Sequence, residues 1–191
     1  MGREFELKFR ADERILAAIE AEFGPFSGIA METVYYDTPD RDLHRLRWTL
    51  RRRLENGNPV CTVKTPAPGG GRGEWETPCG DIMEAMPILV EQGAPAEIWA
   101  LSRKGLSPVC GARFTRLATV VTRSGCTVEL ALDRGVFLGN HRELPFAEVE
   151  VELKQGSDAQ AVSFAQSLAQ AFHLIPEPKS KLQRAMELAN R

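Results

Sequence analysis

The sequence predicts a mainly antiparallel α+β fold, whose strands form a sheet or close into a β-barrel. Charged and apolar residues alternate strictly from Glu4 to Arg10, which is the period of a strand with two unlike faces. Asn56-Gly57 and Ser124-Gly125 lie between alternating runs and predict two hairpin turns. Apolar residues recur at helical spacing in residues 157–174. We expect one domain over residues 1–191, long enough to bury a substantial core.

Composition argues against several function classes. Hydrophobic residues make up 43% and charged residues 26% of the chain, both normal for a soluble globular protein. The formal charge of -2 provides no overall attraction to nucleic acid or to an anionic membrane. No apolar run approaches the roughly 20 residues that span a bilayer, and no signal peptide opens the chain. We therefore expect a cytoplasmic protein with no nucleic-acid or membrane partner.

Cysteine and histidine positions give little support to zinc or triad chemistry. The four cysteines are scattered without a C-x-x-C spacing, and the three histidines are equally dispersed. Reduced structural thiols are the simpler interpretation of such cysteines. A zinc site and a Ser-His-Asp triad are both disfavoured.

The first elements follow from local signals. After the strand at 4–10, residues 11–24 predict a helix with Asp12 as its N-cap and Gly24 at its end. Residues 31–39 predict a second strand, which ends at a Thr-Pro-Asp turn. The hairpin at 46–66 turns at Asn56-Gly57.

The remaining elements alternate between strands and helices. A Gly-rich loop precedes a short alternating strand at 72–77. Residues 81–105 predict interrupted helix, and residues 111–135 predict a long hairpin. A strand at 146–156 is followed by the helix at 157–174, capped by Ser157, and by a short C-terminal helix within residues 176–191.

Five strands gather charges on a single face. If Asn56-Gly57 is the turn, Arg51 lies opposite Thr62 and Thr49 lies opposite Lys64. Directly opposed residues project to the same side, so the basic residues of this hairpin share one face. The second turn places Arg116 opposite Asp133, on the face of Glu129. Arg113 and Arg123 fall on the other face.

The opposite faces of these strands are apolar and must be buried, for example at Phe5, Leu7 and Phe9. If helices cover the apolar faces, the charged faces line the interior of a closed sheet. Solvent-exposed charge stripes are the alternative interpretation. Clustered acids favour hard divalent cations, and clustered Arg and Lys suit phosphate. Both together indicate a cavity for a metal-bound polyphosphate.

At this point the motifs resemble a known family. E-x-E-x-K near the N-terminus is accompanied, in order, by VYYDTPDRDL, LRRR, TVK, RGEWE, FTR, VELALDRG, AEVEVEL and KSKLQRA. These motifs resemble those of the CYTH superfamily, the triphosphate tunnel metalloenzymes, and most of all its bacterial inorganic triphosphatases. The resemblance covers essentially the whole chain. It implies a closed eight-stranded antiparallel barrel that forms a tunnel with helices packed outside, in an enzyme that is often dimeric.

The resemblance also implies roles for individual residues. Mg²⁺ or Mn²⁺ would be held by Glu4, Glu6, Glu148 and Glu150, with Glu129 and Asp133 serving a second ion or a water. Triphosphate would be bound by Lys8, Arg51, Arg53, Lys64, Arg72, Arg116 and Lys181. The residues expected to act in the chemistry are Lys8, Glu76, Arg51 and Arg53. Glu152 shares the acidic face near the tunnel end. Hydrolysis would proceed by in-line attack of a metal-activated water on the terminal phosphorus.

Several activities are compatible with this tunnel. Thiamine triphosphate hydrolysis, nucleoside or RNA 5′-triphosphate hydrolysis and adenylate cyclisation are alternatives within the family. Trp48 and Trp75 fall off the tunnel face by parity, which weakens a pocket for an organic group and favours inorganic triphosphate. A non-catalytic polyphosphate-binding module is the alternative of a different class. The cluster of acids argues against it, because a pure polyanion binder gains nothing from carboxylates.

Overall fold

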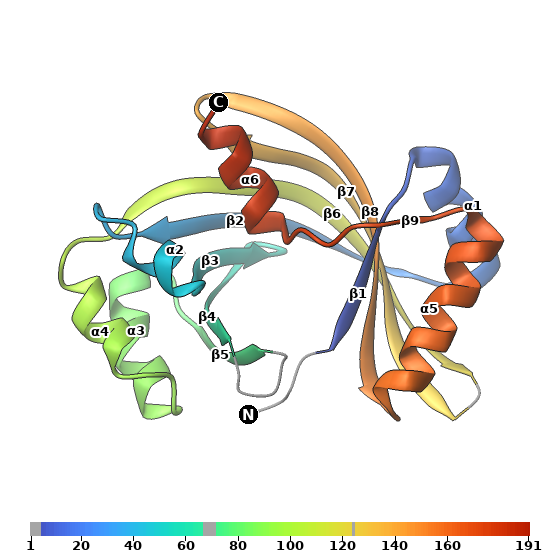
Figure 1. Ribbon diagram of the computed structural model, residues 1–191, viewed down its shortest axis with the longest axis horizontal. Helices are drawn as coiled ribbons and strands as arrows, with labels where there is room; N and C mark the ends of the chain where they lie inside the picture. Colours follow the sequence, from blue (N-terminus) through green and yellow to red (C-terminus); the bar gives the residue numbers. More distant parts are fainter. Residues whose placement is uncertain (1–4, 67–71, 124) are drawn as a thin grey trace.

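The computed structural model describes residues 5–66, 72–123 and 125–191, which form one antiparallel sheet and six helices. Nine strands are hydrogen-bonded in the order β5-β4-β3-β2-β6-β7-β8-β1-β9. Figure 1 shows this sheet bent into an arch, with β5 towards one end and β1 towards the other. The concave side of the arch carries the candidate site.

The elements have the following bounds. The strands are β1 (Glu6–Arg10), β2 (Ser27–Asp37), β3 (Thr49–Glu55), β4 (Asn58–Pro66), β5 (Arg72–Pro78), β6 (Ser107–Arg123), β7 (Cys126–Gly139), β8 (Arg142–Gln155) and β9 (Ile175–Pro176). The helices are α1 (Glu13–Phe23), α2 (Asp42–Leu46), α3 (Ile82–Glu91), α4 (Glu97–Ser102), α5 (Asp158–Phe172) and α6 (Lys181–Ala189). In the described part of the chain, no helix is both long and apolar enough to span a membrane.

The predicted hairpin registers are confirmed. Asn56 and Gly57 have φ of 49° and 84°, as a two-residue hairpin turn requires. Arg51 accordingly pairs with Thr62, and Thr49 pairs with Lys64. In the second hairpin, Arg116 pairs with Asp133. Because side chains alternate along a strand, these registers place Arg51, Lys64 and Arg116 on the concave face, and Arg52 and Arg113 on the convex face.

The apolar faces of the strands are buried on the convex side, as expected. Helices α1 and α5 cover the β7-β8-β1 end, where Leu16, Leu130 and Val151 belong to one core. Helices α3 and α4 cover the β3-β4-β5 end, where Val63 and Trp75 belong to another (Figure 1). Burying each such large side chain contributes about 1.5–3 kcal/mol. The two cores therefore hold the charged faces towards the concave side.

Helix α6 is the exception, because it packs on the concave face. Its residues Ala185, Met186 and Leu188 share a core with Phe114 and Phe137, whose parity is that of the charged side chains. Ser180 caps the helix, and Gln183 reciprocates in a capping box. The helix thus covers part of the concave face and delivers its first residue, Lys181, to the charged region.

The expectation of a closed eight-stranded barrel is wrong. The sheet has nine strands and remains open, because β5 pairs only with β4 and β1 pairs with β8 and β9 within the described residues. Phe9 and Arg10 of β1 pair with Pro176 and Ile175 of β9. This pairing occupies part of the β1 edge that closure would need.

Two short elements were not expected. Strand β9 lies between α5 and α6, and helix α2 follows the Thr-Pro-Asp turn. Asp37 orders that turn, because its carboxylate accepts hydrogen bonds from the backbone N–H of Thr38, Leu43 and His44. Residues 81–105, expected as interrupted helix, form α3 and α4.

Gly135 of β7, which pairs with Phe114 of β6, provides a test of packing. A Cβ at Gly135 would lie 2.1 Å from the carbonyl oxygen of Arg113, a backbone atom that cannot yield. We expect Gly135→Ala to lower the free energy of unfolding by roughly 3 kcal/mol, measured by urea denaturation. Gly28→Ala is the control, because its Cβ would meet only Leu117, at 3.6 Å. Equal free energies of unfolding for Gly135→Ala and Gly28→Ala would contradict the close contact between Gly135 and the backbone of Arg113.

Candidate functional site

The concave face encloses a cavity of about 590 Å³ that is lined mainly by charged side chains. Acidic and basic residues are equally numerous in its described lining. The acids are Glu6, Glu55, Glu74, Glu76, Glu129, Glu150 and Glu152, and the bases are Lys8, Arg51, Arg53, Lys64, Arg116, Lys154 and Lys181. A cavity that is neutral overall suits a polyanion that arrives with divalent cations better than a bare polyanion.

The acidic side comes from strands β7, β8 and β1. Glu6 lies directly opposite Glu152, which in turn lies opposite Glu129. Three carboxylates thus form one row across adjacent strands, an arrangement of like charges that is destabilising by itself. Lys154 approaches this row, at 2.8 Å from Glu152 and 3.6 Å from Glu129, and Lys8 lies 3.5 Å from Glu6.

The basic side comes from strands β3 and β4. Lys64 lies 3.1 Å from Glu74, and Arg51 lies 3.7 Å from the same carboxylate. Arg53 Nε donates to Thr33 Oγ1 at 3.4 Å and Nη1 lies 3.4 Å from Glu55. The contacts of Arg51 and Arg53 are long for charge-assisted hydrogen bonds, so these two guanidinium groups retain capacity for an anion.

Two features of Arg51 and Arg53 are of the kind that a bound anion relieves. The Nε of Arg51 is buried and has no hydrogen-bond partner within the described residues. Burial, and then the positive charge of Arg51, lower the pKa of Arg53 to about 10. Both features are relieved when an anion with several oxygens supplies acceptors and negative charge.

A second acidic cluster, Asp133, Glu148 and Glu150, lies deeper, at the base of α6. Oxygen atoms from its three residues lie within 4.8 Å of one another. Lys181 Nζ lies 2.7 Å from both Asp133 and Glu150 and also contacts Glu148. Arg116 holds Asp133 through Nε at 2.8 Å and Nη2 at 2.7 Å, and contacts Glu150 as well.

These contacts control the ionisation of the deep cluster. Burial by itself would raise the pKa of Glu150, but the charges of Lys181 and Arg116 hold it well below its usual range. Burial by itself would lower the pKa of Lys181, but the three carboxylates raise it above its usual range. The pKa of Glu148 is raised to about 7, because its burial and the charge of Glu150 oppose ionisation.

The structure brings most of the predicted site residues to the cavity. Those that line it are Glu6, Lys8, Arg51, Arg53, Lys64, Glu76, Arg116, Glu129, Glu150 and Lys181. Asp133 and Glu148 are fully buried and are not part of the cavity lining. Glu4 lies outside the described residues, and so does the side chain of Arg72. The roles of all these residues remain predictions.

Tyr35, Glu74 and Arg184 are among the residues of the region that were not predicted as site residues. Tyr35 lines the cavity and pairs with Arg51, and its face follows from the register of β2 and β3. Glu74 contacts two of the basic residues. Arg184 contacts Glu148 and lies three residues after Lys181, a helical spacing that places both side chains on one face of α6.

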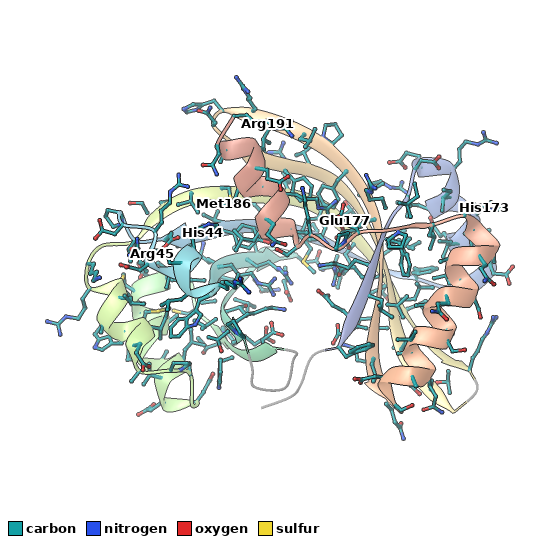
Figure 2. The ribbon with its side chains drawn as sticks, in the orientation of Figure 1. His44, Arg45, His173, Glu177, Met186 and Arg191 are labelled. Atoms are coloured by element: carbon teal, nitrogen blue, oxygen red, sulfur yellow. The ribbon has the colours of Figure 1, made fainter. Side chains whose placement is uncertain are left out.

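Other residues lie away from the cavity as expected. Trp75 is buried in the core beneath α3, and Trp48 packs against the same core. All four cysteines are free. His44 on α2 and His173 at the end of α5 lie on opposite sides of the molecule, while Glu177 lies more centrally (Figure 2). These positions give no support to a shared histidine site.

The fold and the cavity together define an antiparallel domain that presents a charged site on its concave face. A CYTH-domain model matches residues 2–186, so the chain belongs to the CYTH-domain family. This finding confirms the family that the motifs indicated.

Individual relatives were also found. The chain is 25% identical over 200 residues to the inorganic triphosphatase of Haemophilus influenzae, covering 100% of this chain and 56% of that protein. The chain thus spans about half the length of this relative.

Solved structures share the fold. HpAC1 from Hippeastrum, described as a candidate adenylyl cyclase with a dominant triphosphatase activity, superposes with a TM-score of 0.72 at 16% identity, covering 97% of this chain and 96% of that one. A candidate adenylate cyclase from Bacillus halodurans gives 0.63 at 18% identity, covering 96% and 98%. At these identities the likeness shows the fold alone.

Proposed function

We propose that the chain is a metal-dependent hydrolase that removes the terminal phosphate from inorganic triphosphate. The observation that carries this proposal is one cavity in whose described lining seven carboxylates and seven basic side chains face a common space. The name of the Haemophilus influenzae relative supports the same activity. A polyanion alone gains nothing from the carboxylates, whereas a metal–triphosphate complex uses both the acidic and the basic side chains.

The cavity-facing carboxylates fit a divalent cation. Glu6, Glu129 and Glu152 offer oxygen donors in adjacent positions, and Glu150 faces the cavity from the same strand as Glu152. Hard oxygen donors suit Mg²⁺ and Mn²⁺ equally. A divalent ion, when bound, lowers the pKa of a coordinated water and neutralises charge on phosphate oxygens.

The basic residues bind and orient the substrate. Arg51, Arg53, Lys64, Lys8 and Arg116 all line the cavity, where their positive charges would meet the phosphate oxygens of a bound triphosphate. Fixed cations stabilise the charge that spreads over the transferred phosphoryl group. Glu76 is exposed and makes no ion pair among the described residues, so a carboxylate oxygen of Glu76 is available to accept the proton of the attacking water.

Tyr35 adds a neutral donor to this site. Tyr35 is 4% exposed, and its hydroxyl has no hydrogen-bond partner within the described part of the chain. Burial raises the pKa of Tyr35, against the charges of Arg51, Arg53 and Lys181, so the hydroxyl keeps its proton for donation. We expect Tyr35→Phe to lower kcat/KM for tripolyphosphate about 10-fold, measured by phosphate release.

The control for Tyr35 is its neighbour in the same strand. Tyr36 packs against the core on the opposite face of the sheet. Tyr36→Phe is therefore expected to leave kcat/KM within about twofold of the wild type. Equal losses in the two variants would contradict a role for the Tyr35 hydroxyl.

The apolar part of the cavity lining favours a second candidate, hydrolysis or cyclisation of an organic triphosphate. Ile29, Met31, Ala118 and Leu182 contribute to the lining, and inorganic triphosphate offers nothing apolar to contact them. An organic group attached to the phosphates would bury this surface. Inorganic triphosphate remains the first candidate, because Trp48 and Trp75 pack in a core on the other face of the sheet and neither is part of the described cavity lining.

One screen tests both candidates. Phosphate release is measured from tripolyphosphate, ATP, thiamine triphosphate and long-chain polyphosphate, each with Mg²⁺, Mn²⁺ or EDTA. We expect the fastest metal-dependent release from tripolyphosphate. Production of cyclic AMP from ATP would replace this proposal with a cyclase, and binding without release would replace it with a polyphosphate-binding module.

The partners follow from the same proposal. We propose a small polyanion as the substrate, with no nucleic-acid or membrane partner, in the cytoplasm. The expected homodimer remains a prediction that sedimentation analysis of the purified protein can test.

A further inference from the structure

The deep cluster contains its own counter-charges. The three carboxylates of Asp133, Glu148 and Glu150 face three basic side chains, those of Lys181, Arg116 and Arg184. Arg184 contacts Glu148, and its guanidinium also lies 4.6 Å from the ring centre of Phe137. A divalent cation here would have to displace protein cations that already balance the charge, at a desolvation cost for each group released.

Exposure separates the members of this cluster. Asp133 and Glu148 are 0% exposed, whereas Glu150 is 8% exposed and lines the cavity. Lys181 and Arg116 also line the cavity. The fully buried carboxylates of Asp133 and Glu148 are therefore separated from the cavity by Lys181 and Arg116, which line it.

The hydrogen bonds fix the orientation of both cations. The three carboxylates contact Nζ of Lys181, which has three N–H donors. Arg116 uses Nε and Nη2 on Asp133 and Glu150, and its Nη1 has no partner among the described residues. Arg116 is therefore held along one edge of its guanidinium, and Nη1 remains available for a phosphate oxygen.

We propose that Asp133 and Glu148 are positioning residues that hold Arg116 and Lys181 for the triphosphate, and that they do not coordinate the divalent ion. This inference rests on the proposed function, and it separates two kinds of carboxylate in the region. Glu6, Glu129 and Glu152 form the row that faces the cavity and takes the metal. Asp133 and Glu148 act only through the basic residues in front of them.

Charge-matched double variants test the proposal. Glu148→Gln/Arg184→Gln and Asp133→Asn/Arg184→Gln each remove one buried negative and one positive charge, which limits the loss of stability. Arg184→Gln alone is their reference. Glu152→Gln/Lys154→Gln is the matched control, because it removes a contacting acid–base pair from the cavity-facing row. Denaturation curves identify any variant that is not folded.

Two equilibrium measurements distinguish the roles without turnover. Calorimetry gives the Kd for Mn²⁺ and, in EDTA, the Kd for tripolyphosphate. We expect the Asp133 and Glu148 double variants to keep the Mn²⁺ Kd within about twofold, while the Glu152 double variant raises it at least about 10-fold. We expect the same Asp133 and Glu148 variants to raise the tripolyphosphate Kd at least about fivefold relative to Arg184→Gln.

The results that overturn the proposal are equally specific. A 10-fold loss of Mn²⁺ affinity, which equals about 1.4 kcal/mol of binding free energy, in the Asp133 or Glu148 double variant would show that this residue is a metal ligand. Unchanged tripolyphosphate affinity in both would reduce their role to stability alone. Absence of hydrolysis by the wild type contradicts the proposed function instead, because the EDTA measurement does not depend on turnover.

Discussion

Replacing Arg51 by Gln is expected to lower kcat/KM for tripolyphosphate by about 100-fold to 1000-fold, because it removes a preorganised cation from the substrate cavity. The Arg51 side chain is 11% exposed and its Nε has no partner among the described residues, so little of its hydrogen-bonding capacity is spent on the protein. Glutamine keeps part of the length and a donor but loses the charge and the bidentate geometry. Phosphate release at saturating Mg²⁺ or Mn²⁺ measures the loss.

The neighbouring arginine provides the matched control. Arg52 lies on the convex face of the same strand, where Nη1 donates to the carbonyl oxygen of Gly80 at 3.2 Å. Arg52→Gln changes the net charge identically and is expected to leave kcat/KM within about twofold. If both variants lose activity equally, overall charge rather than the cavity position of Arg51 explains the effect, and the assignment of the basic side is wrong.

Lys181→Met is expected to lower the free energy of unfolding by about 3–5 kcal/mol, because it leaves buried carboxylates without their shared cation. Lys181 is 9% exposed, and the side chains of Asp133 and Glu148 are 0% exposed, so water cannot take its place easily. Urea denaturation at neutral pH measures the loss. Methionine preserves much of the apolar stem, which limits the contribution of lost packing.

The pH dependence of that loss follows from the directions of the pKa shifts. Glu150 has its folded-state pKa below the ordinary value of 4.5, so its contribution to stability is present above that pH and disappears as pH falls. Lys181 has its folded-state pKa above 10.5, so its contribution is present below that pH and disappears as pH rises further. The difference in the free energy of unfolding between the wild type and Lys181→Met should therefore be largest between pH 4.5 and pH 10.5 and should become smaller in acid. A change of one pKa unit corresponds to about 1.4 kcal/mol of stability. A difference in the free energy of unfolding that stays constant down to pH 3 would therefore contradict the ion-pair explanation.

Much of the site could be predicted because hairpin register and side-chain parity are local properties. Asn56-Gly57 determines which residues of β3 and β4 oppose each other, and one residue of slip would have moved every charge to the other face. The same reasoning placed Arg116 beside Asp133 and separated it from Arg113. Burial of the apolar faces then decided which side was the interior.

The open sheet and the position of α6 could not be predicted, because both depend on contacts between segments that are distant in the sequence. Closure of the sheet requires two edge strands to meet, and nothing in the alternation of β1 shows that β9 occupies part of its edge. The amphipathic pattern of α6 predicts a buried face without saying which side of the sheet receives it. For that reason the pairing of Lys181 and Arg184 with buried carboxylates was not predicted, and the deep cluster was expected to be a set of metal ligands.

The position of α6 has a consequence for the order in which this domain can mature. Lys181–Ala189 follows every described strand along the chain, so a growing polypeptide completes the sheet before the helix exists. Until then Phe114 and Phe137 lack their covering residues, and Asp133 and Glu148 lack one or more of their cations. The convex cores can form during synthesis, but the charged site is assembled only when the last helix docks.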